Sequence, residues 1–380
     1  MFSPFIAGLK NMTRPLAAIA LASTLIACQG SEYMGAKHEK PISDSIKRKI
    51  QRYSMDEHSP ILVRLFKEES ELEVWKEARS GTYELLETFE ICKWSGKLGP
   101  KFKEGDRQAP EGFYKISRAQ MNPNSDYYLA FNLGFPNKYD RAHDRTGTFL
   151  MVHGACSSRG CYAMTDEQIS DIYALARESF LGGQRKFQVH AFPFRMTAKN
   201  MAKHSGSEHY EFWKMLKEGS DHFEVTGRPP KIDVCDKKYV FNANLKNSGA
   251  RFNPRNSCPA YEVPQRVAKA VAQKQLSDNL KIQEYQTASV RRKERQDAVA
   301  SFFGNEQGPA RSSLALQQAS GPSPKQPTAA QLSLAPIQSQ AEKSESKKQG
   351  FLTVFNNLIP QDDNRSVPTI NAVPQPKALP

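Results

Sequence analysis

A histidine and a cysteine lie eight residues apart at the end of a strand-like segment, and together they have the chemistry of a nucleophile and its base. His153 follows the β-branched and apolar run 148–152, and Gly160 directly precedes Cys161. A cysteine attacks carbonyl carbons as a thiolate, and a nearby imidazole can take its proton. Gly160 lets the backbone turn sharply, so the amide N–H groups of Gly160 and Cys161 can point at a developing oxyanion. The pattern therefore predicts acyl transfer through a thioester.

Two other interpretations of these residues remain open. Cys161 could be a small buried hydrophobic residue beside a strand-ending His153, since free cysteine is among the most buried residue types. Alternatively, a zinc ion could be held by side chains from this part of the chain. The candidate ligands are His143, His153, Cys156, Cys161 and His190. Their spacing is irregular and no Cys-x-x-Cys is present, so we expect no metal and no other cofactor.

The predicted elements place this pair at the end of a sheet. Apolar runs bounded by turn residues predict strands at 60–66, 72–75, 83–91, within 109–116, at 127–133 and at 148–152. The first three would form a β-meander, and the others would continue the same sheet up to the histidine.

A helix is expected directly after the cysteine. Thr165 is followed three residues later by Gln168, which is the pattern of a helix N-cap, and an apolar stripe at helical spacing comes next. Gly182 and Gly183 would end this helix before another strand at 187–192. Cys161 should therefore lie between a strand and a helix, where catalytic groups often lie.

The first 28 residues have the composition of an export signal. Basic residues precede the apolar run 16–22, and the segment 25–28 reads Leu-Ile-Ala-Cys. This ending resembles a bacterial lipoprotein signal, in which Cys28 would be lipidated and become the mature N-terminus. An ordinary secretory peptide cleaved near the same place is the alternative. Both predict export to the periplasmic side, and Gln29 favours an outer membrane lipoprotein attached to the membrane through its lipid.

Export bears on the remaining cysteines, because disulfides form in an oxidising periplasm. Four cysteines are available for pairing, and these are Cys92, Cys156, Cys235 and Cys258. We expect a bridge between Cys235 and Cys258, which lie close together in a loop-rich region. A bridge from Cys156 to Cys161 would block the nucleophile, so Cys156 is expected to be buried or else to be a redox partner.

Composition divides the rest of the chain. Residues 29–58 are polar and predict a tether, and folded sequence is expected to start near residue 59, with a catalytic domain over 59–200. A helical and loop extension over 201–263 and a polar, exposed helix over 264–299 are expected next. Residues 300–380 are rich in Gln, Ser, Ala and Pro and are predicted to be disordered, because they cannot bury enough apolar surface to fold.

The chain is strongly basic. Its 380 residues carry a formal net charge of +13, and they are enough for one or two domains with a substantial core. Such a charge suits an anionic partner, although a solvated basic surface would have the same charge. Because an exported protein rarely meets nucleic acid, we expect an anionic polymer of the cell envelope and no nucleic acid.

Several segments resemble the YkuD-type catalytic domain of L,D-transpeptidases, which act on bacterial peptidoglycan. Residues 96–97 and 109–114 are similar to one family pattern, and 153–154 with 158–161 are similar to its active-site motif. Five further blocks resemble the YafK-like murein L,D-transpeptidase subgroup, at 121–125, 133–137, 139–143, 145–147 and 160–166. The resemblance covers about residues 59–200. It implies a mainly β fold with α-helices, a β-sandwich or sheet with a helix after the cysteine.

The resemblance also implies roles for individual residues. Cys161 would attack an amide at meso-diaminopimelate in a peptidoglycan stem peptide, and His153 would take and return the proton. Gly160 and Cys161 would supply the oxyanion N–H groups, and Ser158 would support the loop. We therefore expect a cysteine enzyme of cell wall organisation.

Two departures from the family pattern concern the substrate. The family places its histidine much further before the cysteine, with His in place of Arg159 and Arg in place of Ala163. The YafK-like subgroup shares these departures, and it includes an amidase that releases a covalently bound outer membrane lipoprotein from diaminopimelate. Such an amidase is one alternative, with a wall-attached lipoprotein as partner, and a non-catalytic wall-binding lipoprotein is another. Arg141, Arg145 and Arg159 are the candidates for binding a substrate carboxylate.

Overall fold

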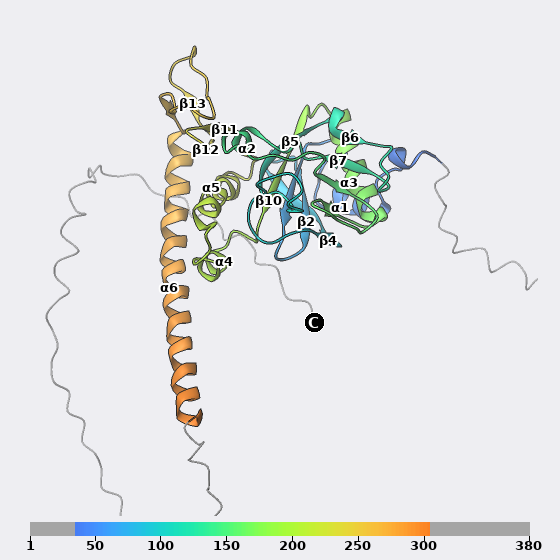
Figure 1. The fold of residues 1–380 in the computed structure, drawn as a ribbon. Coiled ribbons are helices and arrows are strands. Elements are labelled where there is room, and N and C mark those ends of the chain that lie inside the picture. Colours follow the sequence, from blue (N-terminus) through green and yellow to red (C-terminus); the bar gives the residue numbers. More distant parts are fainter. Residues whose placement is uncertain (1–34, 305–380) are drawn as a thin grey trace, which may run out of the picture. The chain divides into compact units, whose positions relative to one another are not determined.

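A computed structural model describes residues 35–304 of the chain (Figure 1). The predicted signal peptide, the predicted lipidation site Cys28 and most of the predicted disordered tail lie outside the described residues. None of the helices within 35–304 combines the length and the hydropathy that a membrane span requires.

Short strands and helices alternate along the described residues. The strands are β1 (Ile61–Phe66), β2 (Glu71–Glu77), β3 (Tyr83–Glu90), β4 (Lys93–Trp94), β5 (Gly112–Ser117), β6 (Met121–Asn122), β7 (Ala130–Asn132), β8 (Met151–His153), β9 (Tyr162–Ala163), β10 (Lys186–Phe192), β11 (Ile232–Cys235), β12 (Lys238–Phe241), β13 (Asn244–Leu245) and β14 (Tyr261–Glu262). The helices are η1 (Lys37–Glu39), α1 (Asp44–Arg52), η2 (Arg118–Gln120), α2 (Lys138–Ala142), α3 (Asp166–Leu181), α4 (Ala198–Lys203), α5 (Tyr210–Thr226) and α6 (Gln265–Gly304). This mixture of sheets and helices, with a helix after the cysteine, confirms the expected fold class.

The larger strands form a five-stranded sheet in the order β3-β2-β1-β10-β5. β1, β2 and β3 are successive antiparallel neighbours, which confirms the predicted meander. β10 then lies parallel to β1, with Val189 beside Val63. All six residues of β1 are buried, because both faces of this central strand are covered.

The strands that lead to the histidine form a second sheet, so the expectation that they continue the first sheet is wrong. Its order is β4-β9-β8-β7-β6. β8 pairs antiparallel with β7 on one side and parallel with β9 on the other. Parallel neighbours cannot be joined by a tight hairpin, so residues 154–161 must pass from one end of β8 back to the start of β9.

Two hydrophobic cores lie on opposite faces of the first sheet. One core joins this sheet to the second sheet and to α3, and it includes Val63, Phe131, Val152 and Ile172. The other core packs α5 and the β11–β12 hairpin against the first sheet, with Trp213 among its residues. The apolar side chains of α5, including Trp213 and Leu216, are therefore used for packing.

Helix α3 begins as the sequence predicts. The Oγ1 atom of Thr165 accepts a hydrogen bond from the Gln168 N–H at 3.2 Å, and Oε1 of Gln168 accepts one from the Thr165 N–H at 3.0 Å. This reciprocal capping box satisfies two N–H groups that the helix cannot pair itself. Gly182 caps the other end of the helix, as expected.

Folded structure begins earlier than expected, so the predicted tether is wrong for its second half. Ile42, Ile46 and Ile50 are at most 4% exposed and belong to the first core. The backbone N–H and the hydroxyl of Ser43 both donate to the carboxylate of Asp171 on α3, at 3.0 Å each. An isoleucine at every fourth position gives α1 an apolar stripe that its many charged residues obscure.

The long helix α6 begins where a polar helix was expected and continues to Gly304. Residues 300–304 therefore belong to this helix and not to the predicted disordered tail. α6 packs along α4 and α5 (Figure 1), where Lys217 donates to Asp278 at 2.6 Å. The extension before it contains a disulfide between Cys235 and Cys258, which confirms the predicted bridge.

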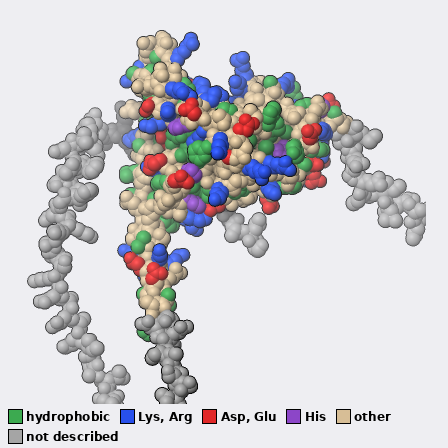
Figure 2. Space-filling model, viewed as in Figure 1, with side chains coloured by type: hydrophobic (Ala, Val, Ile, Leu, Met, Phe, Trp, Pro, Cys, Tyr) green, Lys and Arg blue, Asp and Glu red, His purple; other side chains and the backbone are tan. Residues whose placement is uncertain are grey.

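Lys and Arg side chains are interspersed with Asp and Glu over the face that Figure 2 shows. The excess of positive charge is thus spread over this face and does not form a single patch on it.

Candidate active site

Two neighbouring strands bring the histidine and the cysteine to the same cleft. His153 ends β8 and lies beside Ala163 of the parallel strand β9, and Cys161 directly precedes β9. The N–H of Met151 on β8 donates to Sγ of Cys161 at 3.4 Å. The parallel pairing therefore brings the predicted base and nucleophile to adjacent strands on the wall of one cleft.

Both side chains line a cleft of about 520 Å³. The other lining residues come from the turn before β7, from β8 and its preceding loop, and from the loop between the two strands: Asn122, Asn124, Ser125, Asp126, Tyr127, Phe149, Met151, Ser157, Ser158 and Arg159. Polar and aromatic side chains dominate this wall, so the cleft suits a polar, peptide-like substrate.

The environment of His153 keeps its imidazole neutral and fixes the position of its proton. Nδ1 lies 2.6 Å from the carbonyl oxygen of Gly154, and because a carbonyl oxygen only accepts, Nδ1 carries the proton. Burial lowers the pKa of His153, and the hydrogen bond to Gly154 opposes this effect. The imidazole ring packs against the ring of Tyr127, with the two ring centroids 4.6 Å apart. Nε2 is therefore the unprotonated nitrogen of a neutral ring, as a general base requires.

The thiol of Cys161 is protonated at rest. Burial raises its pKa, while the Met151 N–H and the charge of Lys101 act in the opposite direction. No hydrogen bond joins this thiol to the His153 imidazole among the described residues. The raised thiol pKa and the lowered imidazole pKa together indicate a neutral pair, in which proton transfer accompanies attack on the substrate.

Ser158 holds the backbone around the nucleophile, in agreement with its predicted role in the loop. Its Oγ accepts from the N–H groups of Gly160, at 3.3 Å, and Cys161, at 3.1 Å, and donates to the Cys161 carbonyl at 2.7 Å. The expectation that these two N–H groups are free to bind an oxyanion is therefore wrong for this structure. The cause is that the tight turn at Gly160, where φ is +126°, folds them onto the Ser158 hydroxyl.

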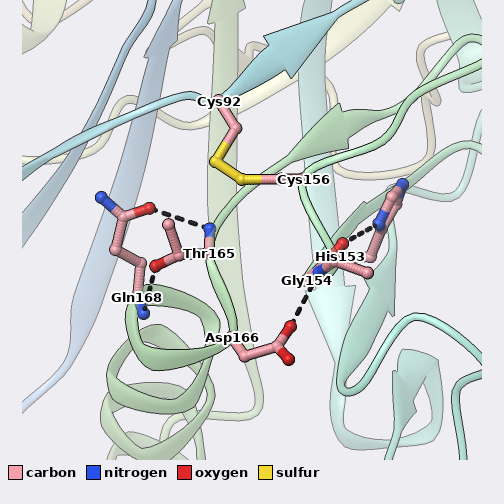
Figure 3. The surroundings of a disulfide bond; sticks show 8 residues. Cys92, His153, Gly154, Cys156, Thr165, Asp166 and Gln168 are labelled. Atoms are coloured by element: carbon pink, nitrogen blue, oxygen red, sulfur yellow. Dashed lines mark hydrogen bonds between the residues drawn. A yellow bond between two sulfur atoms is a disulfide. The ribbon is translucent and has the colours of Figure 1, made fainter.

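The loop between the two strands is tied by a disulfide (Figure 3). Cys156 is bonded to Cys92, and both residues are exposed. The expectation of a buried Cys156 is wrong, because Cys92, which directly precedes β4, comes close enough to bond it. Cys161 is the free cysteine of the described residues, and so its thiol remains available.

Two of the three arginines predicted to bind substrate lie outside the cleft. Arg145 is buried, donates to Asp140 at 2.9 Å and lies over the rings of neighbouring aromatic residues. Arg141 is exposed on α2 and lines a different cavity, beside Lys138. The predictions for Arg141 and Arg145 are therefore wrong, since their place in sequence before β8 does not bring them to Cys161.

Arg159 does line the cleft, together with a carboxylate that the sequence analysis missed. Asp126 and Arg159 are both exposed, and among the described residues neither forms an ion pair or a side-chain hydrogen bond. Apart from His153 and Cys161, the cleft wall therefore has one negatively charged side chain, Asp126, and one positively charged side chain, Arg159. Asp126 directly follows the block 121–125, and this position beside a motif was the available signal in the sequence.

The alternative zinc ligands are not brought together. No group of three or more potential metal ligands is found within residues 35–304. Cys156 is committed to its disulfide, and Nε2 of His190 pairs with Gln188 on β10 in the other sheet. His143 lies near the Lys237 carbonyl, away from the cleft.

The sequence matches a known family across this site. The YkuD family, described as the L,D-transpeptidase catalytic domain, matches residues 65–189. A protein of Escherichia coli strain K12, named "Putative L,D-transpeptidase YafK", is 41% identical over 232 residues, which cover 60% of this chain and 92% of that protein. A protein of the same name from Escherichia coli O157:H7 matches to the same extent. The region matched by the family, residues 65–189, contains both His153 and Cys161.

Two solved structures align with lower similarity. The helical cell shape determining protein Pgp2 from Campylobacter jejuni is 19% identical, covering 53% of this chain and 84% of that chain, with a TM-score of 0.30. Bd1075 from Bdellovibrio bacteriovorus is 16% identical, covering 55% of this chain and 95% of that chain, with a TM-score of 0.28. These TM-scores are too low for either structure to inform the function of this chain.

Proposed function

The chain belongs to the YkuD-type L,D-transpeptidase family, and we propose that it is a cysteine enzyme that transfers acyl groups at meso-diaminopimelate in peptidoglycan. The observation that carries the proposal is the shared cleft of His153 and Cys161, in which the imidazole presents an unprotonated Nε2. A neutral histidine beside a protonated thiol is the starting state for general-base activation of a nucleophile.

The reaction begins when Sγ of Cys161 attacks the carbonyl carbon of the scissile amide while Nε2 of His153 takes the thiol proton. Collapse of the tetrahedral intermediate breaks the C–N bond, and the imidazolium gives its proton to the leaving amine. This step leaves a thioester on Cys161. A second nucleophile then attacks the thioester carbonyl, gives a proton to Nε2 and restores the thiol. An amine acceptor makes this a transpeptidase and water makes it an amidase.

The opposite charges on the cleft wall support a substrate with a free amino-acid end. Diaminopimelate has two amino-acid centres, and the one outside the peptide chain carries both an ammonium and a carboxylate. Asp126 can pair with the ammonium and Arg159 with the carboxylate, since neither has another ion-pair partner within residues 35–304. Such paired recognition orients the adjacent amide over Cys161.

We also propose that the protein works outside the cytoplasm, attached to the outer membrane through a lipid on Cys28. The disulfides Cys92–Cys156 and Cys235–Cys258 support an oxidising compartment. The positive net charge of the chain suits an anionic cell envelope. Mass spectrometry of the N-terminal peptide from membrane fractions tests this, and an unmodified peptide in a soluble fraction would exclude the lipid anchor.

The activity is tested by incubating purified sacculi with the wild-type protein, with Cys161→Ala and with His153→Ala. We expect the wild type alone to change the muropeptide profile measured by mass spectrometry. New crosslinks at diaminopimelate would show that an amine attacks the thioester, as in a transpeptidase. Release of a wall-bound protein would show that water attacks it, as in an amidase. Identical profiles for the wild type and Cys161→Ala would exclude the catalytic function and favour a wall-binding protein.

A further inference from the structure

The loop of residues 154–160 connects the proposed base to the proposed nucleophile, and a covalent bond ties its middle to another part of the chain. Cys156 is bonded to Cys92, with their Cα atoms 5.3 Å apart. Figure 3 shows this disulfide, the Asp166 carboxylate and the His153 imidazole arranged around the same loop. The loop also supplies part of the cleft wall through Ser157, Ser158 and Arg159.

The backbone of this loop has a conformation that needs support. Ala155 and Cys156 have φ angles of +61° and +43°, and residues with a Cβ rarely adopt the left-handed region, because it costs free energy. Three bonds hold this conformation. The Ala155 N–H donates to Asp166 at 2.8 Å, the Cys156 N–H donates to the Met164 carbonyl at 3.1 Å, and the disulfide fixes the Cys156 side chain.

The disulfide reaches the nucleophile through a strand pair as well as through the loop. Cys92 directly precedes β4, and Trp94 of β4 lies beside Tyr162 of β9. Cys161 is the residue before Tyr162. The disulfide therefore ties the loop before Cys161 to residue 92, and the hydrogen-bonded pair β4–β9 joins the next residues of that segment to the strand after Cys161, so a change in the bond should be felt at the thiol.

The bond is also open to reagents. Cys92 and Cys156 are both exposed, whereas in the other disulfide Cys258 is exposed and Cys235 is completely buried. Thiol–disulfide exchange requires access to a sulfur atom, so a dithiol can attack Cys92–Cys156 from either end but Cys235–Cys258 from one end, and the first bond should open faster.

We propose that the Cys92–Cys156 disulfide positions the Cys161 thiol in the cleft and that its reduction by a dithiol switches the enzyme to a less active state. This inference rests on the proposed function for the role of Cys161. In the reduction, the dithiol gives two electrons and two protons. The S–S bond breaks to form two thiols, and the dithiol closes to its own disulfide. The freed loop can then leave the left-handed conformation, which loosens the Ser158 contacts around Cys161.

The test compares two double variants of the full chain. Cys92→Ser with Cys156→Ser removes the proposed tie, and Cys235→Ser with Cys258→Ser is the matched control at the other disulfide. We expect the first pair to lower kcat on muropeptides at least tenfold with little change in KM, and the control pair to keep kcat within twofold. Thermal unfolding of both variants shows whether each is folded.

A second readout needs no substrate. The rate at which iodoacetamide alkylates Cys161 is measured against pH by mass spectrometry. Because burial raises the pKa of this thiol, a loosened loop should shift the alkylation midpoint to lower pH in the first variant and not in the control. A purely structural role would change stability without moving this midpoint.

If the first double variant does not fold, the wild-type protein is titrated with dithiothreitol while mass spectrometry follows each disulfide. Loss of activity that follows opening of Cys92–Cys156, and recovery on reoxidation, is the expected result. Unchanged kcat and alkylation after this bond opens, equal effects of the control pair, or a bond that resists the dithiol would overturn the proposal. If Cys161→Ala retains activity, the proposed function fails instead, and the alkylation profile still decides whether the tie positions the thiol.

Discussion

The hydroxyl of Ser158 forms hydrogen bonds with both the N–H and the carbonyl of Cys161, at 3.1 Å and 2.7 Å. Because a hydroxyl has one proton and Ser158 gives it to the carbonyl, the neighbouring Ser95 hydroxyl must donate to Ser158, at 2.8 Å. The nucleophile is therefore held through its backbone by the hydroxyl of a residue on the same loop. Among the described residues, the thiol itself forms only long hydrogen bonds, from the Met151 N–H at 3.4 Å and to the Phe149 carbonyl at 3.6 Å.

Replacing Ser158 with Ala should lower both stability and activity. The change leaves two N–H groups and a carbonyl without their partner, and lost hydrogen bonds of this kind cost about 1–3 kcal/mol. We expect a lower free energy of unfolding in urea and a fall in kcat of roughly tenfold or more as the Cys161 backbone loosens. Ser157→Ala is the control, since Ser157 is exposed on the same loop. Equal kcat for the two variants would contradict the role of Ser158.

The pH dependence of the site follows from the directions of two pKa shifts. Burial raises the pKa of Cys161, so its alkylation by iodoacetamide should reach half its maximum at a higher pH than that of free cysteine. Burial lowers the pKa of His153, so neutral imidazole persists to lower pH than in a model peptide. The acid limb of kcat/KM should therefore lie below the ordinary histidine value.

The titration midpoint of the Cys161 thiol is measured by mass spectrometry of the alkylated protein. The midpoint of the His153 imidazole is measured separately, from the pH dependence of muropeptide turnover. A neutral pair predicts that the thiol titrates above the imidazole. A thiolate paired with an imidazolium would give the reverse order, and alkylation that is already maximal below the ordinary histidine pKa would exclude the neutral pair. His153→Gln should reduce turnover about 100-fold or more while leaving the alkylation of Cys161 largely unchanged.

Local signals in the sequence were sufficient for the elements next to the nucleophile. The Thr165 and Gln168 pair predicts the start of α3 because a capping box involves only neighbouring residues. The Cys235–Cys258 bridge is also short in sequence. Both predictions depend on contacts that a short segment makes with itself, and both are confirmed.

Contacts between distant segments could not be predicted in the same way. Cys92 and Cys156 are separated by 64 residues in sequence, and the pairing of β4 with β9 helps to bring their segments together. Arg145 has the sequence position of a substrate ligand, but it pairs with the buried Asp140. An arginine on a loop and an arginine in a buried ion pair have the same local pattern, so the sequence does not distinguish them.

The charges on the cleft wall predict how substrate affinity should change. Asp126→Asn removes a partner for the ammonium group and Arg159→Gln removes a partner for the carboxylate. Each should raise KM for muropeptides by about 10- to 150-fold, with a smaller effect on kcat, because a charge-assisted hydrogen bond contributes about 1.5–3 kcal/mol.

The control for these variants is Arg141→Gln, because Arg141 is exposed but lies outside the cleft. A substrate whose diaminopimelate carboxylate is amidated should lose affinity for the wild type and not for Arg159→Gln. An equal loss for both proteins would show that Arg159 does not bind that carboxylate. Calorimetric titration of Cys161→Ala with muropeptides measures these affinities without turnover.

The N-terminal helix should contribute to the stability of the domain. Ile46 on α1 is 1% exposed and packs in the first core, and Ile→Ala changes at such positions cost about 2–5 kcal/mol. We expect Ile46→Ala to lower the free energy of unfolding in urea by this amount, while the exposed Arg48→Ala leaves it nearly unchanged. Equal stabilities would show that α1 is not part of the cooperative core.

Gly154 offers the most local test of how the loop is held. A Cβ at this position would lie 2.5 Å from Oδ1 of Asp166 and 2.9 Å from the Tyr127 carbonyl, so Gly154→Ala must displace the loop from both. Since Gly154 also accepts the hydrogen bond from His153 at 2.6 Å, the displacement should change the imidazole as well. We expect kcat to fall at least tenfold, because catalysis is sensitive to shifts of about 1 Å in the reacting groups. Gly206→Ala is the control, since no atom lies within 4 Å of a Cβ there, and nuclear magnetic resonance of the His153 ring reports the proton position directly. A Gly154→Ala protein with unchanged kcat and an unchanged His153 spectrum would show that the loop tolerates this displacement, and that the Gly154 carbonyl does not set the orientation of the base.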